Sequence, residues 1–187
     1  AVARKAPLAG VRAPQATGIA LDGQNLLRVP ASRFLIPATN DFSVFLWTRD
    51  DAASAATVQY LSDNSGPTQT NRCSFGSTFS ATTSPGKLFF FHPDATFTGN
   101  TSVRDSGWHQ VGLVRRGTVM ELWLDGELDG SRDYGEGFTL SQATDWRVGA
   151  SAAENVNFLT GRLDDLRIYT NALAAADISA LYDSYTP

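Results

Sequence analysis

The chain has 187 residues, of which 42% are hydrophobic and 18% are charged, and its formal net charge at pH 7 is -4. This composition excludes a disordered chain, because there is enough apolar side chain to build a core. The negative charge argues against nucleic acid as a partner, and no apolar run approaches the roughly 20 residues that cross a membrane. The single cysteine, Cys73, cannot form an intramolecular disulfide, and we expect it to be buried.

Residues 1–16 are rich in Ala, Pro and Arg, lack periodicity, and are predicted to be a tail or linker. Over residues 17–187, short apolar segments alternate with turn sequences such as TTSPG, DSG, RRG and GEG. This pattern predicts an all-β domain, an antiparallel β-sandwich (jelly roll) of two sheets with about fourteen strands and one short C-terminal helix. The strands expected from the pattern cover residues 43–47, 57–61, 73–79, 87–91, 109–115, 120–124, 145–149 and 163–169.

Three local patterns make more specific predictions. Residues 43–47 alternate, which places Val44 and Leu46 on one face of a strand and Phe45 and Trp47 on the other. The Asp125-Gly126 pair predicts a tight hairpin, because a type I′ turn needs positive φ at both central residues. Helical spacing is clear over residues 175–181, with Ala174 in the place where a serine would cap the helix, unless Thr170 or Asn171 substitutes.

Three sequence segments resemble the laminin-G-like and pentraxin-like lectin superfamily, which has the concanavalin A-like lectin/glucanase fold. They are IALDGQNLLRVP at 19–30, GWHQVGLVRRGTVMELWLDGELDG at 107–130 and GRLDDLRIYTNALAAADISALY at 161–182. They follow the family's order, although Leu21 replaces the usual Phe of the opening Phe-Asp-Gly strand. The resemblance implies the fold specifically. It implies function only broadly, because this fold carries lectins, adhesion domains and enzymes.

The resemblance also implies a structural calcium ion that ties the first strand to the last. Its ligands would be Asp22 and Asp164, with backbone carbonyls of residues 23–25 added to them, since calcium binds several oxygen ligands. The alternative is that Asp22 starts a turn and that Asp164 or Asp165 pairs with Arg162 or Arg167. Calcium is the only cofactor that we expect.

Candidate ligand contacts lie in loops and at strand ends, where binding residues concentrate on a rigid sandwich. Trp146 stands where the family usually has a smaller residue, so we expect it to be an exposed surface for stacking a sugar ring. The resemblance assigns Trp47 and Trp108 to packing positions instead. His92 follows a strand and either faces a ligand or lies at the surface. The full candidate set is Asn64, Arg72, His92, Tyr134 and Trp146, and the alternative for each is a solvated rim.

Enzyme chemistry has weaker support in the sequence. A glycosidase needs two carboxylates on one face of a cleft, but Glu121 and Asp125 are separated by three residues and Asp125 lies in the expected turn. Asp125, Glu127 and Asp129 are spaced two apart, yet Gly126 and Gly130 mark this stretch as a hairpin. A lyase would need a set such as Tyr134, His92 and Arg72.

The sequence therefore predicts a secreted, non-catalytic carbohydrate-binding module that holds a polysaccharide for a linked catalytic domain. Nearly all positive charges are arginines, which favours an acidic or sulfated glycan, although genomic base composition explains the same bias. A protein-interaction or adhesion domain is the first alternative. A polysaccharide-degrading enzyme, either a glycosidase or a lyase, is the second. We expect no nucleic acid and no membrane insertion.

Overall fold

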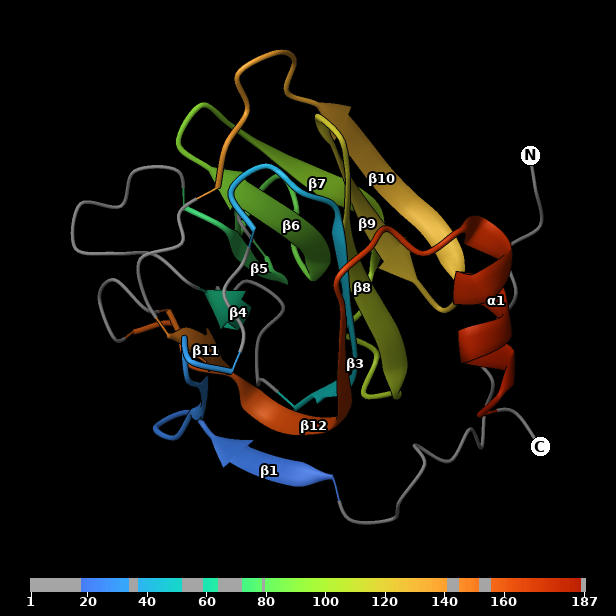
Figure 1. Ribbon diagram of the computed structural model, residues 1–187. Coiled ribbons are helices and arrows are strands. Elements are labelled where there is room, and N and C mark those ends of the chain that lie inside the picture. Colours follow the sequence, from blue (N-terminus) through green and yellow to red (C-terminus); the bar gives the residue numbers. More distant parts are fainter. Residues whose placement is uncertain are drawn as a thin grey trace.

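A computed structural model describes residues 18–33, 37–51, 59–63, 72–78, 80–140, 145–151 and 156–185 (Figure 1). The predicted tail at 1–16 lies outside these residues. The described part contains twelve strands in two sheets of six, and one helix. The predicted class, an antiparallel β-sandwich with one short C-terminal helix, is confirmed, while the described strands number two fewer than the fourteen expected for the whole chain.

Sheet A contains the first and last strands of the chain side by side. Its strand order is β1-β12-β3-β8-β9-β10, and every neighbouring pair is antiparallel. The strands are β1 (Ile19–Asp22), β3 (Phe42–Asp50), β8 (His109–Arg116), β9 (Val119–Leu124), β10 (Glu127–Asp133) and β12 (Thr160–Tyr169). The expected hairpin between β9 and β10 is confirmed, since Asp125 and Gly126 have φ values of 51° and 80°.

Sheet B has the strand order β2-β11-β4-β5-β6-β7, again antiparallel throughout. Its strands are β2 (Leu27–Val29), β4 (Gln59–Asp63), β5 (Ser74–Ser77), β6 (Lys87–His92), β7 (Ala95–Ser102) and β11 (Trp146–Val148). Strand β7 was not expected, because its sequence ATFTGNTS contains a single large apolar residue.

The core lies between the two sheets and follows from alternation along the strands. In β3, Val44 and Leu46 point into it, as the sequence predicts, while Phe45 and Trp47 point to the outer face of sheet A. Sheet B contributes side chains such as Phe75 and Phe90 to the same core. The side chains of Cys73 and Trp47 are both about 1% exposed, so both expectations of burial are confirmed.

Helix α1 (Ala175–Asp183) packs on the outer face of sheet A, on the side away from sheet B (Figure 1). Its Ile178 contacts a second apolar cluster that includes Phe45 and Trp123, and Tyr182 stacks on Trp47 with ring centroids 5.7 Å apart. Ala174 is the N-cap and forms no side-chain cap hydrogen bond. This helix, the one helix of the described residues, is too short to cross a membrane. Helix α1 therefore covers the outer face of sheet A over β3, β8 and β9.

Candidate ligand-binding face

The outer face of sheet B carries polar, charged and aromatic side chains in rows that cross the strands. Because the neighbours of each residue point into the core, strand pairing places these side chains on the opposite side. One row crosses all six strands and consists of Arg28, Arg147, Asp63, Ser74, Phe91 and Thr96. The row beside it consists of Tyr60, Gly76, Phe89 and Thr98.

Arg72 joins these two rows through its guanidinium group. Nη2 donates to Asp63 Oδ2 at 2.6 Å and to Ser151 Oγ at 3.1 Å, and Nε donates to Ser74 Oγ at 2.5 Å. Ser74 in turn donates to Asp63 Oδ1 at 2.9 Å. The ion pair is almost fully buried, with 5% of the Arg72 side chain and none of the Asp63 side chain exposed. Such pairs persist in a low-dielectric site only when hydrogen bonds complete them, as they do here.

Two aromatic rings enclose the same guanidinium group. The ring centroids of Tyr60 and Phe91 lie 5.1 and 5.2 Å from the Arg72 Cζ atom, within the range of cation–π contacts. Phe89 meets Tyr60 edge to face at 5.3 Å. The residues Tyr60, Asp63, Arg72, Ser74, Phe91 and Ser151 are called the Arg72 cluster below. The cluster combines aromatic faces with fixed hydrogen-bonding groups on a rigid sheet.

Gly76 allows the aromatic layer to lie close to the strands. A Cβ atom at this position would lie 2.8 Å from the Phe89 ring and 2.2 Å from the Gln59 carbonyl oxygen. Any larger residue would therefore displace Phe89, which packs against Tyr60. The flat arrangement of this face thus depends on a glycine in the middle of β5.

Two of the predicted contact residues are misplaced in the sequence analysis. Trp146 is not an exposed stacking surface, because its side chain is 1% exposed and packs in the core between the sheets. The alternation in β11 explains this error, since Trp146 and Val148 both point inward and Arg147 points outward. His92 does not lie at the surface either, since it is 2% exposed.

His92 and Tyr134 lie together, but as part of the packing at the end of β6. Their rings meet edge to face at 5.5 Å, and Tyr134 stacks on Phe138 at 4.4 Å. Tyr134 donates its hydroxyl hydrogen to the Ala95 carbonyl at 2.7 Å. His92 Nε2 donates to the Thr139 carbonyl at 3.2 Å, and burial lowers the pKa of His92 below its ordinary value, which favours the neutral ring.

The set of tyrosine, histidine and arginine considered for a lyase is not assembled. His92 points to the inner side of β6, whereas the preceding residue, Phe91, points outward beneath Arg72. Of the predicted contacts, Arg72 alone lies on the outer face of sheet B among the described residues. Asn64 lies outside them.

The structure places the predicted calcium ligands on the expected strands but not beside each other. Strands β1 and β12 are paired, as predicted, yet Asp22 faces Thr160, and Asp164 lies four residues further along β12. Four residues of a strand span about 13 Å, so one ion cannot contact both carboxylates. Within the described residues no three His, Cys, Asp or Glu side chains gather around a possible metal position.

Each of these two carboxylates has local partners instead. Asp22 Oδ1 accepts hydrogen bonds from Gln24 N and Asn25 Nδ2, both at 3.0 Å, in an exposed turn. Asp164 Oδ1 accepts from the Asp165 amide at 2.8 Å. The interpretation of Asp22 as a turn-starting residue is therefore confirmed, and so is an ion pair between Asp165 and Arg167, at 2.8 Å. Calcium binding stays a prediction.

The carboxylates considered for a glycosidase have separate partners. Glu121 accepts hydrogen bonds from Arg116 and from Trp123 Nε1. Asp125 accepts from His109 Nδ1 at 2.8 Å, at the hairpin turn. Asp129 binds backbone amides of β7. These groups do not line a common cleft among the described residues.

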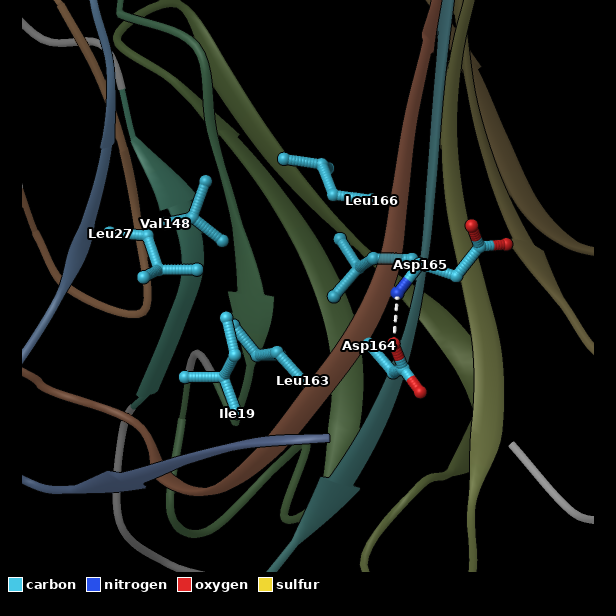
Figure 2. A pocket seen from close by; sticks show the side chains of 8 residues that line it. Ile19, Leu27, Val148, Leu163, Asp164, Asp165 and Leu166 are labelled. Carbon is cyan, nitrogen blue, oxygen red and sulfur yellow. Dashed lines mark hydrogen bonds between the residues drawn. The ribbon is translucent and has the colours of Figure 1, made fainter. Parts of the chain in front are cut away.

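A small cavity lies between the sheets, near β1, β2, β11 and β12 (Figure 2). Its volume is about 80 Å³, well below the ~300 Å³ at which ligand pockets begin. Figure 2 shows apolar side chains such as Ile19, Leu27 and Val148 gathered in it, with the carboxylate of Asp165 turned away. Neither its size nor its lining suits a sugar.

The comparisons with known proteins agree with this architecture. The model of the family described as "Concanavalin A-like lectin/glucanases superfamily" matches residues 21–179, which is most of the chain. The chain belongs to this superfamily. The resemblance noted in the sequence is thereby confirmed. No curated protein matches the chain in sequence.

Solved structures with a fold similar to that of this chain include modules from two glycan-degrading enzymes. The CBM40 of Ruminococcus gnavus IT-sialidase has a TM-score of 0.68 and 16% identity, with 88% of this chain and 96% of that chain covered. Domain 4 of AbnA, a GH43 extracellular arabinanase from Geobacillus stearothermophilus in complex with arabinotriose, has a TM-score of 0.66 and 15% identity, with 87% and 75% covered. Domains LG4-5 of mouse laminin alpha1 have a TM-score of 0.59 and 18% identity, with 91% of this chain and 48% of that chain covered. At these identities the likeness shows the fold.

Sequence reasoning missed Tyr60, Asp63 and Phe91 as members of the candidate site. The run KLFFFH does contain a signal, because in a half-buried strand at least one of three consecutive phenylalanines must leave the core. No sequence pattern shows that Arg72 lies over the rings of Tyr60 and Phe91, because this contact joins β4, β6 and the segment before β5 in space.

Proposed function

We propose that this protein is a non-catalytic carbohydrate-binding module that holds a polysaccharide on the outer face of sheet B. The Arg72 cluster is the observation that carries the proposal, because its buried polar groups hold the half-buried ring of Phe91 on the outer face of the sheet. Aromatic rings attract the C–H groups of a sugar, and charged or hydroxyl groups bind its hydroxyls. In this proposal the half-buried Phe91 supplies the aromatic contact, and the buried side chains of Arg72, Asp63 and Ser74 hold its ring in place.

Sheet B suits this role better than sheet A. Helix α1 packs on the outer face of sheet A through Ile178 and Tyr182, whereas Arg28, Phe91 and Thr96 on the outer face of sheet B keep part of their side chains exposed. A ligand face built on strands is also held more precisely than one built on loops. These two arguments together favour sheet B as the glycan-binding surface.

The physical benefit of such a module is delivery of substrate. When a binding module is linked to a catalytic domain, the polymer that it holds stays at a high effective concentration near the active site. Two of the similar structures support this role by their descriptions: the CBM40 was solved with sialyllactose, and domain 4 of the arabinanase with arabinotriose. We propose the same role here, in a secreted protein with a linked catalytic domain.

Affinity electrophoresis with Phe91→Ala tests the proposal. The protein runs in gels that contain arabinan, xylan or dextran, and its retardation is measured against gels without polymer. The matched control is Leu128→Ala, which removes an apolar side chain that is 49% exposed on β10 of sheet A. We expect Phe91→Ala to weaken the binding by about tenfold, which corresponds to ~1.4 kcal/mol, and Leu128→Ala to leave it unchanged.

Two results would contradict this assignment. Equal retardation of the parent protein and of Phe91→Ala would place the ligand elsewhere on the molecule. Absence of retardation by every polysaccharide would instead favour the alternative, a protein-interaction or adhesion domain, for which the laminin domains are the structural precedent. Thermal melting of each variant shows whether the fold is intact.

A further inference from the structure

We propose that the polysaccharide is uncharged and runs along β7, where the hydroxyl groups of Thr96 and Thr98 bind it beside the ring of Phe91. This inference rests on the proposed function and adds the chemical class of the ligand, its direction on the sheet and two contact residues. It is carried by the uneven exposure of the outer face of sheet B.

The middle of the outer face of sheet B is buried. Asp63 on β4 and Ser74 on β5 are buried, and so are Tyr60 and Phe89 in the neighbouring row. The described side chains of this face that keep an exposed part lie toward its two edges. A polysaccharide therefore cannot lie across the strands over the whole Arg72 cluster, and it must bind at one edge.

The two edges differ in chemistry. At the β2 edge the outward side chains are those of Arg28 and Arg147, which carry charge. At the β7 edge Thr96 and Thr98 are half-buried, and the half-buried Phe91 lies directly opposite Thr96. A ring that faces the C–H groups of a sugar and hydroxyl groups that bind its hydroxyls are therefore combined at the β7 edge.

Alternation along β7 places both threonines on the outer face. Phe97, which lies between them, packs against the core, so Thr96 and Thr98 point away from it. Directly opposite residues have Cβ atoms about 4.5–5.5 Å apart, so Thr96 and Phe91 can contact the same sugar. Two residues along a strand span about 7 Å, which is comparable with one sugar unit. A polysaccharide that runs along β7 can therefore present neighbouring sugars to the two hydroxyl groups.

The two hydroxyl groups are available for this role. No described residue forms a side-chain hydrogen bond with Thr96 or Thr98, and a threonine hydroxyl can donate one hydrogen bond and accept two. Both side chains are β-branched, which restricts χ1 on a strand. A bound sugar therefore orders little side-chain freedom, which lowers the entropic cost of binding.

The charges around these residues favour an uncharged ligand. Asp94 lies in the turn between β6 and β7, three residues from Phe91, and 78% of its side chain is exposed. Lys87 lies at the other end of β6. The Arg72 guanidinium group lies 5.2 Å from the Phe91 ring centroid, but it is buried and paired with Asp63. An anionic substituent beside Phe91 would therefore be repelled by the exposed carboxylate of Asp94.

Affinity electrophoresis of variants without one hydroxyl group tests the inference. The gels contain arabinan, xylan or dextran, with carboxymethyl dextran and dextran sulfate as the anionic forms of dextran. Thr96→Val and Thr98→Val replace the hydroxyl by a methyl group and keep the β-branched shape that suits a strand. Thr160→Val is the matched control, because Thr160 is a half-buried residue of β12 in sheet A. We expect retardation by a neutral polymer, weakened about fivefold in each of the first two variants and unchanged in Thr160→Val.

The outcomes separate the inference from the proposed function. Full binding by Thr96→Ser together with a loss in Thr96→Val assigns the contact to the hydroxyl group and supports the inference. A loss in Phe91→Ala with full binding in both valine variants overturns it but leaves the proposed function standing. Stronger retardation by the anionic polymers than by dextran, reduced in Arg28→Gln, places the ligand at the β2 edge and overturns the inference as well. Absence of retardation by every polysaccharide overturns the proposed function itself, and the inference with it.

Discussion

Replacing Asp129 by alanine is expected to lower the free energy of unfolding by about 2–4 kcal/mol. Asp129 lies on β10, at the edge of sheet A, and is 1% exposed. Its carboxylate accepts hydrogen bonds from the backbone amides of Asn100 at 3.1 Å and Thr101 at 3.2 Å, on β7 at the edge of sheet B. The substitution leaves two amides without this acceptor, and each costs about 1–3 kcal/mol. We expect a loss in the lower half of the summed range for the two amides, because Asn100 is exposed and water can replace part of its lost hydrogen bond.

Gly99 gives this prediction a second test. A Cβ atom at Gly99 would lie 1.8 Å from Asp129 Oδ2, so Gly99→Ala displaces the carboxylate that joins the two edges. The effects of Asp129→Ala and Gly99→Ala on the free energy of unfolding, measured by urea denaturation, should therefore not add in the double variant. Leu128→Ala, at an exposed neighbouring position, should change stability by less than about 0.5 kcal/mol. Strict additivity, or an Asp129→Ala variant as stable as the parent, would refute this reasoning.

Three further predictions concern the helix, a buried histidine and calcium. Ala174→Ser should stabilise the protein by ~1 kcal/mol, because the N-cap has no side-chain hydrogen bond; an unchanged urea midpoint would speak against it. Burial alone would lower the pKa of His109, but the hydrogen bonds and charges of Asp125 and Asp105 outweigh burial and raise it. The ion pairs of His109 should therefore stabilise the fold fully below pH ~6.5 and lose their effect as the pH rises through the raised folded-state pKa; a stability difference between the parent and His109→Gln that is constant with pH would contradict this. Calcium should raise the melting midpoint relative to excess chelator, and Asp22→Asn should abolish this shift, because Asp22 is the exposed carboxylate beside turn carbonyls; equal midpoints in calcium and chelator would count against a calcium site.

Much of the fold could be predicted because its signals are local. The Asp125-Gly126 pair determines a turn through its own backbone preferences, and alternation over residues 43–47 assigned each side chain of β3 to the correct face. The missing serine at the helix N-terminus was visible as Ala174, and the structure shows no side-chain cap there. The pairing of β1 with β12 was predicted from the family resemblance alone, because no local sequence pattern indicates that these distant segments lie side by side.

The candidate site was harder to predict, because it depends on contacts between strands. Alternation shows that Trp146 and Arg147 point to opposite faces but does not show which face is the core. Choosing the tryptophan as the exposed residue was an error, because the side chain of Trp146 is buried in the core. The contact of Arg72 with Tyr60 and Phe91, and the opposition of Arg28 and Arg147, arise only once the strands pair.

The proposed function requires that the chain bind a polysaccharide without cleaving it. Affinity electrophoresis against neutral and anionic polysaccharides, followed by size-exclusion chromatography of the same polymers after incubation, tests it most directly. A binding module should be retarded by at least one polymer and should leave the chain length of that polymer unchanged. Shortening of the polymer would show an enzyme, and absence of retardation throughout would show that the outer face of sheet B does not bind glycans.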